Sequence, residues 1–430
     1  MIALSLFVGI ANANAQEKKT LSLDEAVQLG IQNSKNLKID AAKIEEATAD
    51  LLEAKNRQLP ELKVSGSYMY LPIKPNVDIK LPGVSGAGGP EVHQVLYGSA
   101  NLSVPIYSGG RIKYGIQSAK YLVEASKLST ENDKIAIAYN VAQAYNNLFK
   151  ANQSIKVFEE NLAASQKRDE TFLKMENNGL IARNDRLKAN LQTSNIELQL
   201  LEAKNNYNIA NINMDLLLGI PETTELEVDE NYIEEGSDVK PVDFYVTEAR
   251  ENRKDLQALA QQRKAAELGS KAAKAENLPS IAFTGGYVAA DIPKFLTVYN
   301  AINVGIGVSY NLSNLWKENS SLRQSQAREK QLAATDELLN DNIKLDVNRE
   351  YQNTDYSKKR ITVFEKSAEQ ANENYRITKN KYDNGLATMT ELLDADAAQI
   401  AANVGVINAK ADAALAYRKL LQTTGTLTIK

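Results

Sequence analysis

Two hydrophobic patterns alternate along this chain. In short stretches every second residue is apolar, and in long stretches apolar residues recur every three to four positions. The short stretches cover 62–70, 94–107, 280–290 and 299–312. In the last of them Ile302 and Val304 flank the polar Asn303, which predicts a strand with one apolar and one polar face. About ten residues is also what a tilted strand needs to cross a bilayer. On the strands alone, an ordinary half-buried hairpin is the better interpretation, because barrel strands give a weak signal per segment.

Each strand pair is preceded by a helical pattern that ends at Leu59-Pro60 or Leu278-Pro279. Each pair is followed by a much longer helical pattern, over 113–177 and 317–382. Sixty-odd residues of helix would measure about 90 Å. The apolar positions in these stretches are sparse, so we expect a thin seam of contact with neighbouring helices and water on more than one side.

The long helical patterns both end in the same short sequence, Asn-Gly-Leu, at 178–180 and 384–386. Gly179 and Gly385 suit the left-handed position that terminates a helix. A shorter helical pattern follows each turn, over 185–218 and 390–424. The sequence therefore predicts two helical hairpins.

The same order of elements occurs twice, and the two copies align. With a shift of 206 residues, Tyr145 meets Tyr351 and Gly179 meets Gly385 without a gap from about residue 99 to residue 219. Before residue 99 the shift is 219, and the difference falls in the Pro/Gly-rich loop that follows the first strand. The chain is thus two tandem copies of one module.

The copies divide the chain into a first repeat at 16–219 and a second repeat at 241–430. The joint at 220–240 carries eight acidic residues and one lysine. We expect it to be a solvated linker, and the alternative is a cation-binding patch.

The N-terminus, MIALSLFVGIANANAQ, has an apolar run followed by Ala13-Asn14-Ala15. This pattern predicts a signal peptide over 1–15 whose positive region is missing or truncated, so the mature chain would begin near Gln16, outside the cytoplasm. No later segment has 18 consecutive apolar residues. An exported chain of this kind is either soluble or a β-barrel.

Composition removes several classes of function. The chain has no cysteine, which excludes disulfides, thiolate metal sites, cysteine nucleophiles and a lipid anchor on an N-terminal cysteine. Its net charge of −4 argues against nucleic acid as a partner. The single histidine, His93, lies in a Gly/Pro-rich loop and is expected to be solvated, so we expect no structural metal and no cofactor. No motif of a hydrolase, a metalloprotease or a phosphate loop is present, which argues against an enzyme.

If the strands cross a membrane, several chains must share one barrel, because four strands cannot close and open edges are not tolerated in lipid. Two chains would give eight strands around a filled interior. Three would give twelve, with room for a channel. The long helices would continue the tube, which explains why they are polar nearly all round.

The paired modules, VPIYSGGR at 104–111 and Y-x-x-G-L-x-T-x-x-E-L-L-D-A at 382–395, resemble the TolC-like outer-membrane efflux proteins. The resemblance covers nearly all of the mature chain. It implies a mainly α fold with transmembrane β-strands, assembled as a homotrimer with a twelve-stranded β-barrel in the outer membrane and an α-helical barrel in the periplasm. The family's members are not enzymes. They dock with a periplasmic adaptor and an inner-membrane pump of the RND or ABC class, and they export drugs, metals or proteins.

The resemblance also assigns roles to residues near the two turns. The family's adaptor-docking tips match Gly179, Leu180, Gly385 and Leu386. The family's pore constriction matches Glu391 and Asp394, with Asp185 at the position of Glu391 in the first repeat and Tyr382 at the position of a gate tyrosine. Ala387 stands where the best-known branch has a locking arginine, so the usual gating bonds are in doubt.

Several of these residues have a second interpretation. Thr388 and Glu391 form a capping-box pattern, in which the acid would cap its helix instead of facing a pore. Tyr382 fits a packed seam. Trp316 and Tyr107, just past strand ends, fit either a membrane-interface belt or core packing. For the whole chain the alternative to a channel is a periplasmic or surface coiled-coil scaffold with soluble hairpins.

Overall fold

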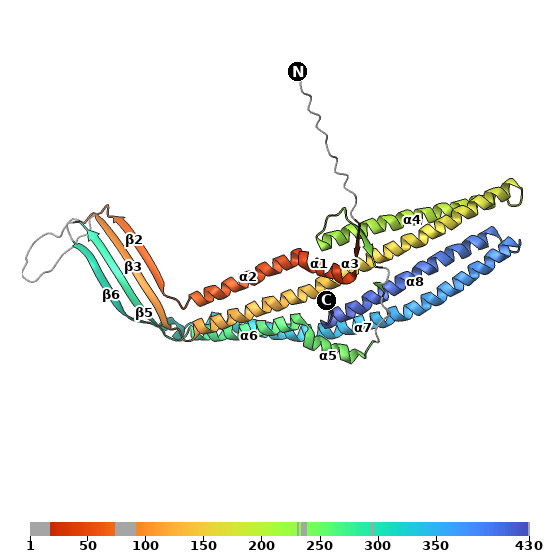
Figure 1. Ribbon diagram of the computed structural model, residues 1–430. Helices are drawn as coiled ribbons and strands as arrows, with labels where there is room; N and C mark the ends of the chain where they lie inside the picture. The colour runs from red at the N-terminus through yellow and green to blue at the C-terminus, as the bar shows by residue number, and fades with distance from the viewer. Residues whose placement is uncertain (1–17, 74–91, 230–231, 234–238, 294–295, 429–430) are drawn as a thin grey trace, which may run out of the picture. The chain divides into compact units, whose positions relative to one another are not determined.

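The structure is a computed structural model that describes residues 18–73, 92–229, 232–233, 239–293 and 296–428 (Figure 1). The expected signal peptide, 1–15, lies outside the described residues, as does most of the Pro/Gly-rich loop. The described chain forms two compact units. One comprises the residues up to Ala41, Leu128–Leu256 and Leu338–Lys430; the other comprises Ala42–Lys127 and Gln257–Glu337.

Most of the described chain is helical. The helices are α1 (Leu23–Asn33), α2 (Lys35–Asn56), α3 (Arg111–Asn177), α4 (Arg183–Leu218), α5 (Val242–Asn252), α6 (Lys254–Ala275), α7 (Ser320–Asp383) and α8 (Met389–Thr424). The helical segment that opens each repeat is two helices, not one. The breaks lie at Ser34 and Arg253, which occupy equivalent places in the two repeats. No described helix is long and apolar enough to cross a membrane.

The second unit contains a four-stranded antiparallel sheet in the order β2-β3-β5-β6 (Figure 1). Its strands are β2 (Glu61–Tyr70), β3 (Gln94–Tyr107), β5 (Ser280–Ile292) and β6 (Leu296–Ser309). The last strand was expected to continue to Leu312. It ends at Ser309 because a 3₁₀ turn, η2, occupies Leu312–Leu315. The two hairpins meet through β3 and β5, so β2 and β6 are the sheet's edges.

The register of the sheet separates its side chains by polarity, because paired residues share a face and neighbours along a strand do not. Tyr287 pairs with both Ala100 and Ile302, and Leu62 pairs with Leu102. The apolar face defined in this way carries Leu62, Val64, Tyr68, Leu96, Leu102, Phe283, Tyr287, Ile302, Val304 and Ile306. The polar face carries Lys63, Ser65, Ser99, Asn101, Ser103, Thr284 and Asn303.

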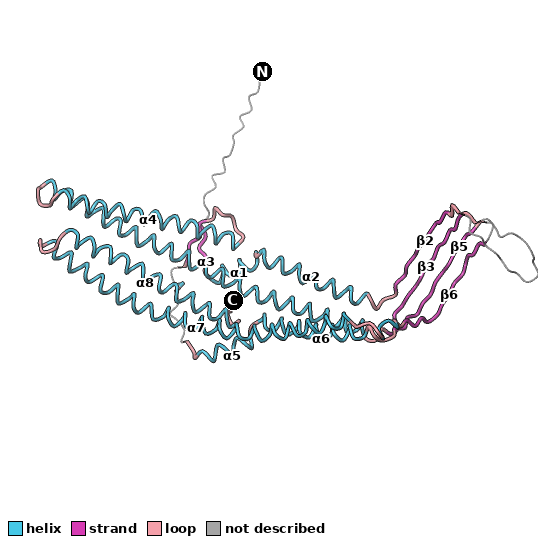
Figure 2. Tube along the Cα trace, turned by 180° about the vertical axis from the view of Figure 1, so that it is seen from behind, coloured by secondary structure: helices cyan, strands magenta, loops and turns pink. Residues whose placement is uncertain are grey.

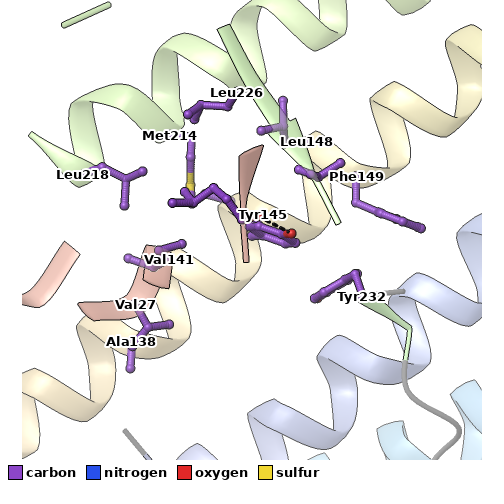
Figure 3. Close-up of a cluster of buried hydrophobic side chains, with 14 of the residues drawn as sticks. Val27, Ala138, Val141, Tyr145, Leu148, Phe149, Met214, Leu218, Leu226 and Tyr232 are labelled. Carbon is purple, nitrogen blue, oxygen red and sulfur yellow. Dashed lines mark hydrogen bonds between the residues drawn. The ribbon is translucent and has the colours of Figure 1, made fainter. Parts of the chain in front are cut away.

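The first unit has its largest core around Tyr145 of α3 (Figure 3). The ring packs against Tyr232 at 5.0 Å between centroids. Its hydroxyl donates to the carbonyl of Leu21 at 2.8 Å and accepts from the amide of Asp229 at 2.8 Å. One buried tyrosine thus joins the start of the described chain to the joint between the repeats. Ala411 of α8 packs on the same cluster.

One described part of the joint at 220–240 is a strand, where its charge suggested a solvated linker. Glu225–Val228 forms strand β4, which pairs in parallel with β1 (Lys18–Leu21). Leu226 and Val228 are buried, whereas Glu227 between them is exposed. Glu225 and Glu227 thus alternate with the two buried apolar residues of this strand. This period-two pattern is present in the sequence, but the acidic composition masked it.

Candidate functional site

The α3–α4 and α7–α8 hairpins lie side by side in the first unit, with their turns at the same end (Figures 1 and 2). Both turns have the same geometry. Gly179 has φ 69° and Gly385 has φ 74°, in the left-handed region that favours glycine. The amide of Leu180 donates to the carbonyl of Met175 at 2.8 Å, and the amide of Leu386 donates to that of Lys381 at 2.8 Å. This is the Schellman pattern that closes a helix.

The outer surface of both turns is open. A Cβ added to Gly179 or Gly385 would meet no other atom within 4 Å. The leucines that follow are 69% and 77% exposed at positions 180 and 386, although leucine is normally buried. Each turn therefore exposes one glycine backbone and one apolar side chain at its surface. These are the four residues predicted as docking tips.

Directly behind the turns, the two hairpins pack on each other. The buried cluster consists of Phe172, Ala189, Met389 and Leu392, with Tyr382 packed against it. The rings of Phe172 and Tyr382 meet edge to face, with centroids 5.8 Å apart. Burial, and then the negative charges of Asp185 and Asp383, raise the pKa of Tyr382. Tyr382 is thus a half-buried packing residue, and Asp185 lies close enough to affect its titration.

Glu391 caps the helix that it begins. Its carboxylate accepts hydrogen bonds from the amide of Thr388 at 2.7 Å and from the Thr388 hydroxyl at 2.9 Å. The hydroxyl in turn accepts from the amide of Glu391 at 3.3 Å, which completes a capping box. These bonds, the one from the backbone first, lower the pKa of Glu391. The carboxylate is nevertheless exposed.

Asp394 and Asp185 have different surroundings. Asp394 is exposed and lies one turn beyond Glu391 on α8, whereas the intervening Leu392 is buried. In the first hairpin Asp185 is half-buried, and Lys188 lies 3.5 Å from its carboxylate. Lys188 occupies the position of Asp394 in the first repeat. The second hairpin therefore presents two acids where the first presents an acid and a base.

One further polar group was not foreseen from the sequence. Arg168 of α3 donates to Asp396 of α8 at 2.7 Å and to the hydroxyl of Tyr375 of α7 at 3.3 Å. Asp396 is buried and Arg168 is partly buried, with side chains 6% and 15% exposed. Burial lowers the pKa of Arg168, but the hydrogen bond and charge of Asp396 outweigh it and raise the pKa overall. Spacing could have revealed the acid, because Asp396 follows the buried Leu392 by four residues and precedes the buried Ile400 by four.

Known structures share this fold. The outer membrane protein VceC of Vibrio cholerae is 17% identical, with a TM-score of 0.76 over 94% of this chain and 96% of that one. The CmeC outer membrane channel of Campylobacter jejuni is 18% identical, with a TM-score of 0.76 over 94% and 86% of the two chains. The open state of the MtrE outer membrane channel of Neisseria gonorrhoeae is 17% identical, with a TM-score of 0.71 over 94% and 89%. No curated protein matches the sequence.

The model of one protein family, described as outer membrane efflux protein, matches the sequence in two consecutive segments, residues 26–220 and 245–426. The two matches confirm the tandem repeat, and together they cover most of the chain. The mainly helical fold with strand hairpins agrees with the three channels above, as the sequence predicted. This chain belongs to the outer membrane efflux protein family.

Proposed function

We propose that three copies of this chain form the outer-membrane duct of a tripartite efflux system. The duct passively conducts substrates that an inner-membrane pump delivers through a periplasmic adaptor. The chain is not an enzyme, in keeping with its family. The strands lie in the outer membrane and the helices form a tunnel in the periplasm.

The observation that carries this proposal is the four-stranded sheet with one apolar face, one polar face and two unpaired edges. On the polar face the hydroxyls of Ser65 and Ser99 lie 2.9 Å apart, and the amide of Asn101 donates to Ser99 at 3.1 Å. Residues of the apolar face such as Val64 and Ile302 are largely exposed. An exposed apolar sheet suits lipid, and a polar opposite face suits a water-filled lumen.

The edges explain the number of copies. The four strands alternate in direction, so β6 of one copy and β2 of the next would run antiparallel and extend the sheet without a break. Three such sheets give twelve strands, which leaves room for a channel, whereas eight strands enclose a filled interior. Closure also removes the open edges that lipid does not tolerate.

We place the adaptor contacts at Gly179, Leu180, Gly385 and Leu386, whose open, apolar turns support this role. We place the constriction of the duct nearby, at Asp394 and Glu391, with Asp185 and Tyr382 contributing. Three copies would bring the paired acids of α8 into one ring. Closely spaced like charges attract cations, and multivalent cations most strongly.

Block by a multivalent cation in planar bilayers tests this assignment. Asp394→Asn should weaken the block strongly, because its exposed carboxylate forms no cap. Glu391→Gln should weaken it less, because Glu391 is held by Thr388. Asp185→Asn should have the smallest effect, because Lys188 offsets its charge. Full block in the Asp394→Asn, Glu391→Gln double variant would place the constriction elsewhere.

A further inference from the structure

The second unit has a hollow of about 520 Å³ at the base of the first repeat's strands, between the end of α2 and the junction of β3 with α3. We call it the basal hollow. Its lining includes Gln58, Tyr107, Ile112, Lys113, Ile116 and Lys120. It is apolar on the isoleucine side, and the two lysines on its wall are exposed.

The equivalent place in the second repeat is lined by different residues. Gln58 and Lys113 correspond to Asn277 and Asn319, by the shifts of 219 and 206 residues. The amide of Asn319 donates to Asn277 at 3.2 Å and to the carbonyl of Ala273 at 3.2 Å, so a polar bridge closes the base of that hairpin. The first repeat has Gln58 and Lys113 in the places of these two asparagines, and both line the basal hollow.

A contact inside one chain indicates which segment of a neighbouring copy would lie next to the basal hollow. Gly109, just after β3, packs so closely on the end of α6 that an added Cβ would lie 2.9 Å from the Cβ of Leu278. In the repeat, Leu278 corresponds to Leu59, and Gly110 corresponds to Trp316. Inside one chain, the segment after β3 contacts Leu278. If β6 of one copy pairs with β2 of the next copy, the segment after β6 should contact Leu59 of that next copy in the same way.

That segment carries a side chain that needs space. Trp316 is the only tryptophan and is 71% exposed in the single chain, so the core-packing interpretation is excluded within the chain. The corresponding residue inside the chain is Gly110, where an added Cβ would lie 2.9 Å from Cε2 of Tyr114, so the space that an indole would need is already filled. Between copies the basal hollow, whose lining includes Gln58, the neighbour of Leu59 in the sequence, provides that room.

We infer that Trp316 of one copy inserts into the basal hollow of the next copy and anchors the interface between them. Ile112 and Ile116 supply an apolar wall for the indole. Lys113 and Lys120 supply cations for its ring faces, and tryptophan is the side chain that cations favour most in this way. A buried tryptophan in a partner's pocket is also a typical energetic centre of an interface. This inference rests on the trimer of the proposed function.

The sequence is suited to a direct test, because it has one tryptophan and no cysteine. Two forms of the chain with different affinity tags are co-expressed, and detergent-solubilised trimers with one copy of the first form and two copies of the second are isolated, with their composition checked by mass. One form is wild type. The other carries Trp316→Phe and Lys113→Cys, with a nitroxide quencher on the cysteine. The control places the nitroxide at Lys127→Cys instead, fourteen residues and about 21 Å further along α3.

We expect tryptophan emission to be lost in trimers labelled at position 113 and retained in trimers labelled at position 127. Equal emission in the two labelled trimers would overturn the inference while leaving the trimer intact. The remaining alternative is that Trp316 lies in the membrane interface. A parallel measurement in vesicles of phospholipid with brominated acyl chains, which quench tryptophan, tests it. If brominated lipid quenches Trp316 and the nitroxide at position 113 does not, the indole lies in the membrane interface and the inference is wrong. Failure to recover any mixed trimer would contradict the proposed assembly itself.

Discussion

Asp215 is a carboxylic acid that the fold buries completely. One of its oxygens accepts from the amide of Asn211 at 2.9 Å, and the other has no hydrogen-bond partner. The residue lies in the last turn of α4, where the helix dipole disfavours negative charge. Burial, and then the charge of Glu222, raise the pKa of Asp215 to about 6. The folded state therefore holds a proton that the unfolded chain releases at lower pH.

We predict that Asp215→Asn stabilises the protein at pH 8 by about 1–2 kcal/mol, and by progressively less as the pH falls toward 4. The sign follows from the raised pKa. As the pH rises from about 4 to 6, the unfolded chain loses the Asp215 proton while the folded protein still holds it. The wild type therefore becomes less stable over this range, whereas the amide variant, which has no proton to lose, does not. Thermal melting followed by circular dichroism at several pH values measures this. If the variant's gain in stability were the same at every pH tested, Asp215 would stay ionised in the folded protein over that range. As a control, Glu222→Gln should lower the pKa of Asp215 and reduce the gain.

Arg168 and Asp396 are expected to depend on each other strongly, because Asp396 is buried and Arg168 is largely shielded from water. Replacing either one alone, by Arg168→Leu or Asp396→Leu, leaves an unpaired buried charge and should cost about 3–5 kcal/mol. The double variant should be less destabilised than either single variant, since it removes both charges. A double-mutant cycle on urea unfolding gives the coupling energy. Additive losses would mean that the two side chains do not interact in solution.

The helical hairpins were largely predictable, because residues next to each helix end determine where the helix stops or begins. The Asn-Gly-Leu turns, and the capping pattern of Thr388 and Glu391, marked boundaries within a few residues of those observed. What could not be predicted depends on contacts between distant segments. Strand β4 is stabilised by β1 from the start of the described chain, and Asp396 finds its partner on another helix.

We predict that Gly385→Trp reduces export and crosslinking to the adaptor, whereas the trimer remains intact. The left-handed turn costs a non-glycine residue about 1–2 kcal/mol, and the indole would cover the tip. Lys379→Trp is the matched control, because position 379 is exposed near the end of the same helix but has ordinary helical geometry. If both variants export and crosslink like the wild type, the turn does not bind the adaptor.

The sheet's two faces make the orientation of the assembled protein testable with neighbouring residues. Asn303 and Val304 are both exposed on β6, but they belong to opposite faces. Val304→Lys would place a charge in lipid and should destabilise the trimer by up to about 2–4 kcal/mol, depending on depth. Asn303→Lys would place the charge in the lumen and should leave the trimer intact. Resistance of the trimer to dissociation on heating in detergent compares the two variants. If Asn303→Lys were the less stable variant, the polar face of the sheet would be the one that faces lipid.

The pairing of β1 with β4 also determines the order in which this chain can fold. Thr20 and Glu227, whose side chains meet at 3.5 Å, are separated by nearly the whole first repeat. Contacts so distant in sequence form slowly unless intervening local structure has brought them together. The α3–α4 hairpin can form from neighbouring residues alone, whereas the cluster around Tyr145 also needs Ala411, close to the end of the chain. The apolar surface of this cluster therefore stays uncovered until Ala411 has emerged on the far side of the inner membrane. A periplasmic chaperone would have the longest opportunity to bind there.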